Sequence, residues 1–517
     1  MDRQAQNQSF TCTDRLLIGA CLLAVLLVYY GLHGLYRPEN MDDAWFLSFA
    51  HHHIVNGIET DVTFGTKPGY GGYGGVALFG KTFTYLYGHA LNLAGWTKSN
   101  AHLISTMCLV ISALCWVSIL QSLKFGRRLS LFFGLAMLLV EPFFGAANQA
   151  RPDALSFLMV SAALLCFLCR RWGISGFLAA VAVEIHPIGV YALVFIASAA
   201  AARLISGEAQ KARQVRMPLW FAAGMGVGGL YYLALHGMNL GLLPAVMSQG
   251  NTGGSQVNNI LFEYFFKTKH MRHIPELVAI LACAFIFIFK RYHRENAFVP
   301  VFLAASVLFT FVIQRPNFMY AIYVYPAFLL LILWVFERHG RLGLAAGLLL
   351  ACLLPQFGLV YWQNRHWDME KYLAQVRSLT PAESVPMVGR PNDWFAFVDR
   401  PFFAVDYRGD FRAAAPEIFV LVEDESFRNN GFPKVKSVAD QFYTSTECGR
   451  FQSRGETVVV KRLVRKKGET GEAGRPPSSL QRERETGFFQ SLENFFPIFP
   501  MIGKAPLCCP PSRNKQI

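Results

Sequence analysis

The sequence has little charge for its length. Only 16% of its 517 residues are charged, whereas 53% are hydrophobic and the mean hydropathy is +0.31. Soluble globular chains carry about 25% charged residues. The composition therefore excludes a soluble globular protein and indicates a chain whose main solvent is lipid.

Acidic residues are scarce, with 34 Asp and Glu against 48 Lys and Arg, which gives a formal net charge of +14. A basic excess is typical of nucleic-acid-binding proteins when it gathers on one face. Here the basic residues stand mostly in short clusters between apolar runs, where orientation in a membrane explains them. We expect no nucleic-acid partner.

Three further features are missing. The 11 Cys lack metal-ligand spacing and lie mostly inside apolar runs, so we interpret them as small core residues rather than a disulfide framework. The first apolar run, Leu16 to Leu35, is not followed by a small-residue cleavage site, which predicts a retained signal anchor. There is no convincing internal repeat, whereas many secondary transporters consist of two related halves.

Long apolar runs are abundant and predict a polytopic, all-α membrane bundle of about eleven transmembrane helices. The runs lie at about Leu16–Leu35, Leu103–Leu123, Leu129–Gly145, Ala154–Cys169, Gly173–Val183, Ile188–Leu204, Leu219–Leu235, Ile274–Phe289, Ala297–Ile313, Phe318–Phe336 and Leu342–Val360. Every second connection is basic. That alternation places the N-terminus and the basic connections in the cytoplasm and the other connections outside.

The composition divides the chain into three parts. Residues 1–360 form the predicted transmembrane domain, with a long first outer loop at 37–100. Residues 361–464 mix short β-rich and helical segments and predict a small extracytoplasmic α/β domain. Residues 465–517 are rich in Lys, Glu, Gly, Pro and Ser, which predicts a disordered tail.

Two adjacent carboxylates, Asp42 and Asp43, follow the first predicted span. At a membrane surface one of them can act as a base or bind a divalent metal, while its neighbour shifts its pKa by like-charge repulsion. Acidic first-turn residues of an ordinary helix, followed by interfacial aromatic anchors, are the alternative.

Charged residues also mark two later outer corners. Arg151 opens a predicted span, where its guanidinium can bind a phosphate through paired hydrogen bonds or can pair locally with Asp153. Glu184 and His186 form an ionisable pair in an apolar context, which is costly unless it has a function.

Arg315 places a second guanidinium outward and is followed by Tyr320, which we interpret as a membrane-interface or packing residue rather than a ligand contact. Lys67, in the first outer loop, can bind a polar ligand or can be an ordinary loop residue. His51, His52 and His53 are adjacent, and adjacent residues of a helix point in different directions. We therefore expect an interfacial polar patch there rather than a metal site.

With Asp42-Asp43-Ala44-Trp45, Ala150-Arg151-Pro152-Asp153 and His186-Pro187 in this order, the sequence resembles the GT-C superfamily of integral-membrane glycosyltransferases. The similarity is to the branch that contains protein O-mannosyltransferases and lipid A aminoarabinose transferases. It covers about the first 360 residues in layout. Asp43 stands where that superfamily commonly has Glu.

The resemblance implies inverting transfer of a sugar from a polyprenyl-phosphate donor, on the outer face of what we expect to be a bacterial inner membrane, to a glycan, glycolipid or protein acceptor. Asp42 would be the general base or the ligand of an assisting metal, with Asp43 beside it. The lipid phosphate would be bound by Arg151 and Arg315, and more weakly by Lys67 and His186. Asp153, Glu184 and Tyr320 are further site candidates. A transporter or flippase of a lipid-linked or polar substrate, and a non-catalytic scaffold, are the alternatives.

Overall fold

The computed structural model describes most of the chain between residues 41 and 466. The described ranges are 41–56, 80–206, 211–236, 259–267, 273–292, 295–313, 318–345, 347–348, 368–382, 385–398, 400–404, 415–424, 433–453 and 455–466, with four single residues between 351 and 365. The predicted first span, Lys67, Arg315, the side chain of Asp42 and the tail from residue 467 lie outside this part.

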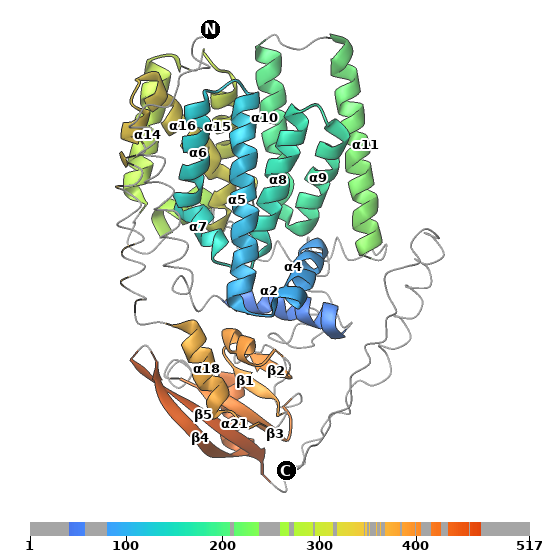
Figure 1. Ribbon diagram of the computed structural model, residues 1–517, viewed down its shortest axis with the longest axis vertical. Coiled ribbons are helices and arrows are strands. Elements are labelled where there is room, and N and C mark those ends of the chain that lie inside the picture. Colours follow the sequence, from blue (N-terminus) through green and yellow to red (C-terminus); the bar gives the residue numbers. More distant parts are fainter. Residues whose placement is uncertain are drawn as a thin grey trace, which may run out of the picture. The chain divides into compact units, whose positions relative to one another are not determined.

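Within the described ranges, ten helices lie side by side as a bundle (Figure 1). They are α5 (Lys98–Ser122), α6 (Arg127–Leu139), α7 (Glu141–Ala147), α8 (Pro152–Leu168), α9 (Trp172–Ile185), α10 (Tyr191–Ile205), α11 (Lys211–Leu235), α14 (Ile274–Phe289), α15 (Phe298–Phe309) and α16 (Ala321–Arg338). Apolar residues recur along these helices without a polar face, as expected for segments surrounded by protein and lipid.

Length and composition give four helices in the described ranges that can cross a membrane: α5, Pro187–Ile205, Arg216–Leu235 and α16. The bent pair of α6 and α7 makes a fifth when it is counted as one broken span, and four shorter apolar helices accompany them: α8, α9, α14 and α15. The predicted count of eleven spans is therefore not confirmed.

The predicted span Leu129–Gly145 is not a single straight helix. It breaks at Val140, whose backbone is extended, and the two halves meet at 59°. Pro142 explains the break, because a proline lacks the N–H that would continue the first helix and its ring clashes with the carbonyl four residues back, whereas it is tolerated in the first turn of a new helix.

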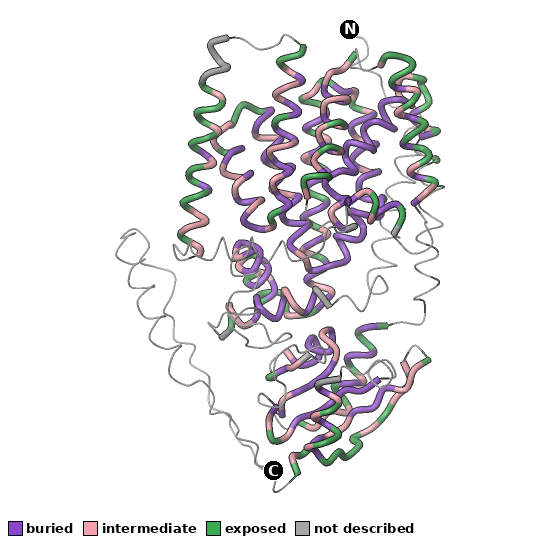
Figure 2. The backbone as a smooth tube through the Cα atoms, turned by 180° about the vertical axis from the view of Figure 1, so that it is seen from behind, coloured by how far each residue is buried: buried purple, intermediate pink, exposed green. Residues whose placement is uncertain are grey.

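Glycines bring α9 and α11 into close contact. A Cβ built on Gly224 would lie 1.9 Å from the carbonyl oxygen of Gly173, and one built on Gly176 would lie 2.1 Å from that of Phe221. Only hydrogen fits at these positions, so the backbones touch as in other small-residue membrane interfaces. The opposite side of α11 is exposed and apolar (Figure 2), which suits contact with lipid.

Short helices lie at one end of the bundle or within its connections. They are α2 (Met41–His51), the π-helix η2 (His52–Asn56), α4 (Lys81–Ala94), η3 (Pro187–Val190), α13 (Ile260–Phe262), η4 (Glu263–Lys267) and η7 (Phe318–Tyr320). Helix α4 overlaps the apolar stretch Val76–Leu93, which is not among the predicted spans because Lys81 and His89 interrupt it.

The described residues of the C-terminal part include a five-stranded sheet in the order β2-β1-β3-β5-β4. Its elements are α18 (Met369–Leu379), β1 (Met387–Gly389), η8 (Pro391–Ala396), β2 (Phe402–Ala404), β3 (Ile418–Glu423), α21 (Pro433–Phe442), β4 (Tyr443–Ser453) and β5 (Glu456–Arg465). Strand β1 pairs in parallel with β2 and β3, while β5 pairs antiparallel with β3 and β4. The predicted mixture of strands and helices is present, and its boundaries at 361 and 464 remain predictions.

Candidate functional site

Asp43 holds helix α2 against two other segments of the bundle. Its buried carboxylate accepts a hydrogen bond from the backbone N–H of Ala150 at 2.7 Å through Oδ1. Its Oδ2 lies 2.9 Å from His102 Nε2 and 3.6 Å from Lys98 Nζ, both on α5. One side chain thus ties α2 to the start of α5 and to the segment between α7 and α8.

The local sequence explains why these partners face Asp43. Lys98 and His102 are four residues apart in the first turns of α5, so they lie on one side of that helix. Arg151 is the N-cap of α8 and Pro152 its first residue, so the N–H of Ala150 is outside any helix. A buried N–H without a partner is costly, and Asp43 supplies that partner.

The surroundings keep Asp43 ionised. Burial by itself acts to raise the pKa of the carboxyl, but His102, Lys98 and the Ala150 N–H together hold that pKa below its ordinary value. The protein therefore places a negative charge at this junction.

Arg151 and Asp153 form a close ion pair one residue beyond that junction. Arg151 Nε donates to Asp153 Oδ2 at 2.7 Å, so the local pairing that the sequence allowed is present. Asp153 Oδ1 is buried and has no hydrogen-bond partner in the part of the chain that the structure describes. The Tyr323 hydroxyl is 3.5 Å from the backbone oxygen of Asp153, which brings α16 to the same place.

His186 belongs to this cluster. Its Nδ1 accepts the N–H of Ile188 at 3.3 Å, so a neutral ring carries its proton on Nε2, which is then a donor. The ring interacts electrostatically with Asp153 and Arg151. Tyr320 lies beside it, with ring centroids 5.4 Å apart. The structure thus brings Arg151, Asp153, His186 and Tyr320 together.

Glu184 has other partners. Its carboxylate accepts the backbone N–H of Lys81 at 2.9 Å and that of Thr82 at 3.3 Å, and it lies 3.1 Å from His236 Nε2. A carboxylate on the first N–H groups of a helix caps that helix. Glu184 therefore joins α9 to the start of α4 and to the end of α11.

Sequence reasoning missed the cations around Asp43 and one buried network. In that network His273 lies between the carboxylates of Glu141 and Glu276, at 3.1 and 3.4 Å, and Glu276 also accepts the hydroxyls of Tyr264 and Tyr325. Glu141, a carboxylate inside an apolar run, is the feature of the sequence that could have indicated this network. Across the described ranges, no group of three or more His, Cys, Asp or Glu side chains has an arrangement that could hold a metal ion.

Comparison with known proteins gives a match in structure only. No protein-family model matches the sequence, and no curated protein matches it significantly. The solved structure of ArnT from Cupriavidus metallidurans bound to undecaprenyl phosphate has a TM-score of 0.59 at 12% identity, covering 87% of this chain and 98% of ArnT. Its apo state gives 0.58 at 12% identity, with 86% and 97% covered.

An oligosaccharyltransferase from Archaeoglobus fulgidus is also similar, with a TM-score of 0.48 at 12% identity, over 84% of this chain and 73% of that one. At such identities a likeness concerns the fold. The chain therefore shares its fold with ArnT, a lipid A aminoarabinose transferase of the GT-C superfamily, as the motifs in its sequence led us to expect.

Proposed function

We propose that this chain is a membrane glycosyltransferase that moves a sugar from a polyprenyl-phosphate donor to an envelope glycan, glycolipid or protein. The observation that carries the proposal is the hydrogen bond from Ala150 N–H to Asp43. It joins two sequence motifs 107 residues apart and sets the acidic helix beside Arg151 and Asp153. The fold shared with ArnT, whose structure contains undecaprenyl phosphate, favours this enzyme over a transporter or flippase.

The proposed reaction needs a base on one side of the sugar and a cation on the other. The acceptor hydroxyl oxygen attacks the anomeric carbon and gives its proton to Asp42. The bond from that carbon to the phosphate oxygen breaks, and its electron pair leaves with the lipid phosphate. Inversion follows from a single attack opposite the leaving group.

The two carboxylates then have different roles. Asp43 is buried and already engaged by Ala150, His102 and Lys98, which suits a positioning residue rather than a base. We assign the proton transfer to Asp42, the preceding residue of α2, whose carboxylate is also the one that would hold an assisting divalent metal.

Arg151 and Arg315 are the proposed partners of the donor phosphate, with Lys67 and His186 as weaker ones. Arg151 Nε donates to Asp153, and a guanidinium also carries two Nη groups, which are of the kind that binds phosphate through paired hydrogen bonds. The Nε2–H of His186 is a donor of the right kind in the same cluster. Asp153 fixes the orientation of Arg151.

An apolar groove suits the prenyl chain of the donor. It has a volume of about 1050 Å³ and is formed by α14, α15, α16 and the helix turns at 259–266. Phe328 lines it and lies on α16 after Tyr323, the residue that contacts Asp153. A chain in this groove would lead away from the proposed phosphate site.

The test is transfer by the purified full-length protein in liposomes, with a panel of undecaprenyl-phosphate sugars and extracted envelope acceptors. Asp42→Asn should abolish transfer without affecting membrane insertion. Asp61→Asn, which neutralises another carboxylate of the same predicted outer loop, is the matched control and should keep full activity. Full transfer by Asp42→Asn would remove Asp42 from the mechanism.

Sidedness can be tested with Cys448, which is exposed on β4 of the C-terminal sheet. We propose that this sheet is extracytoplasmic and the N-terminus cytoplasmic. In a variant whose other cysteines are replaced by Ser or Ala, a membrane-impermeant maleimide should label Cys448 in spheroplasts. Labelling only after lysis would reverse the proposed topology.

A further inference from the structure

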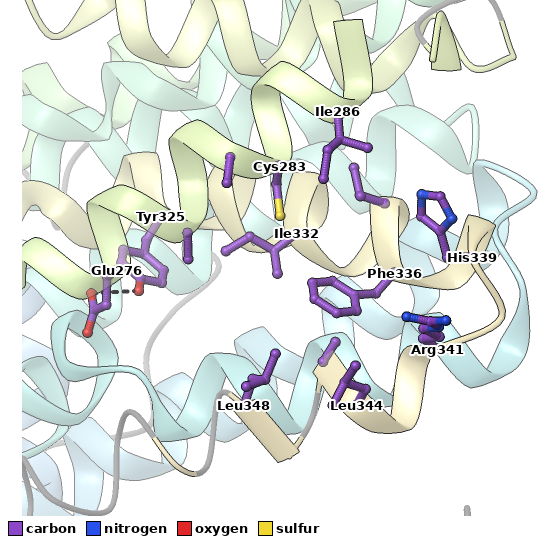
Figure 3. Close-up of a pocket in the computed structure, with 14 residues that line it drawn as sticks. Glu276, Cys283, Ile286, Tyr325, Ile332, Phe336, His339, Arg341, Leu344 and Leu348 are labelled. Carbon is purple, nitrogen blue, oxygen red and sulfur yellow. Dashed lines mark hydrogen bonds between the residues drawn. The ribbon is translucent and has the colours of Figure 1, made fainter. Parts of the chain in front are cut away.

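A second groove lies on another side of α16. It has a volume of about 390 Å³ and is bounded by α14, α16 and the segment 341–348. Its walls are almost entirely apolar and include Cys283, Ile286, Ile332, Phe336, Leu344 and Leu348 (Figure 3). A long hydrocarbon chain is the kind of ligand that such walls favour.

The two ends of this groove differ in charge (Figure 3). At one end Glu276 accepts the hydroxyl of Tyr325 at 2.9 Å, within the buried network described above. At the other end lie His339 and Arg341, both exposed. His339 Nε2 is 3.4 Å from the hydroxyl of Tyr292. Arg341 makes no side-chain ion pair or hydrogen bond within the described ranges.

The length of the groove fits one leaflet of a bilayer. At about 1.5 Å per residue, α16 rises about 16 Å from Tyr325 to Phe336. One leaflet contributes about 15 Å, half of a hydrocarbon core of roughly 30 Å. A single acyl chain that enters at the basic end would therefore lie along the apolar walls between Phe336 and Tyr325 and point toward the Glu276–Tyr325 pair.

The basic end is far from the proposed donor site. Tyr323, which contacts Asp153, is near the start of α16, and Arg338 is its last residue. The rise between them is about 22 Å at 1.5 Å per residue, which is most of the hydrocarbon thickness. A phosphate at Arg341 is therefore at the opposite membrane surface from one at Arg151.

We propose that this groove binds one acyl chain of an anionic phospholipid, with the lipid phosphate on the guanidinium of Arg341 beside His339. Basic residues beside a gap between membrane helices are the usual setting for anionic headgroups, and a guanidinium can grip a phosphate through two hydrogen bonds. The bound chain would fill the space between α14 and α16 and so support the Glu276 network. This site does not depend on the proposed transferase activity.

Native mass spectrometry of the delipidated full-length protein, titrated with dioleoyl phosphatidylglycerol or dioleoyl phosphatidylcholine, tests the site. The anionic lipid should bind at least about fivefold more tightly, as one basic contact at a membrane surface allows. Arg341→Gln should remove that preference. Lys290→Gln neutralises an exposed cation at the end of α14, outside the groove, and should keep it.

A second variant tests the chain rather than the headgroup. Leu348 is about half exposed, so Leu348→Trp should fold while its indole fills the groove and lowers phosphatidylglycerol binding. The proposal is overturned if Arg341→Gln binds phosphatidylglycerol like the wild type, if Leu348→Trp leaves binding unchanged, or if the two lipids bind equally. It is also overturned if Arg341→Gln selectively removes the binding of undecaprenyl phosphate rather than that of phosphatidylglycerol.

Discussion

Replacing Asp43 by Asn should destabilise the protein, whereas replacing Asp42 by Asn should stop transfer without destabilising it. The amide oxygen of Asn can still accept the Ala150 N–H, so the substitution mainly removes the negative charge opposite Lys98 and His102. Lys98 is 6% exposed and Asp43 fully buried. Removing one partner of such a buried ion pair costs about 3–5 kcal/mol, because the other charge is left without compensation.

The pair can be isolated with a double-mutant cycle. In a Lys98→Met background the lysine charge is already absent, so Asp43→Asn should cost less, with a coupling of about 0.5–3 kcal/mol between the two positions. Unfolding of the purified chain by increasing SDS in dodecyl maltoside micelles gives the four free energies. Transfer assays on the same samples separate loss of fold from loss of chemistry.

Two outcomes would refute this division of roles. If Asp43→Asn unfolds at the wild-type SDS fraction, Asp43 does not anchor α2. If Asp42→Asn is as destabilised as Asp43→Asn, the two carboxylates share a structural role.

Three further predictions concern stability. Burial raises the pKa of Asp393 from 3.8 to about 6, although Arg390 opposes this. The folded state therefore holds the Asp393 proton more tightly than the unfolded state, so stability should fall as the pH rises from about 4 to about 6. Asp393→Asn should remove this pH dependence from the thermal unfolding curves. Glu184→Gln should cost about 1–3 kcal/mol by leaving α4 N–H groups short of acceptors, measured in SDS. Gly224→Ala should cost at least about 1–3 kcal/mol by forcing α9 and α11 apart, whereas Gly226→Ala, with open space around it, should not destabilise.

Much of the fold could be predicted because lipid requires long apolar helices, and these are visible as local runs. The bend at Val140 was missed, since the residues on both sides of Glu141 and Pro142 are apolar and were therefore taken together as one span. The helix α9 has only 14 residues, shorter than a typical span. Span counts based on apolar runs are least certain at such segments.

The candidate site could be predicted only as separate motifs. Arg151, Asp153 and His186 stand out because charge is rare in an apolar sequence. No local sequence pattern shows that these three residues lie together or that Ala150 bonds to Asp43. Both depend on contacts between residues far apart in the chain. His102 was missed for the same reason, since its importance comes from the carboxylate that it faces.

The most direct measurement is a cryo-electron-microscopy structure of the full-length protein with undecaprenyl phosphate. We expect the phosphate within hydrogen-bond distance, about 3 Å, of the guanidinium of Arg151 or of Arg315, on the side of the bundle that holds Asp43. A phosphate bound only at the Arg341 end of α16, or one far from both Arg151 and α2, would contradict it.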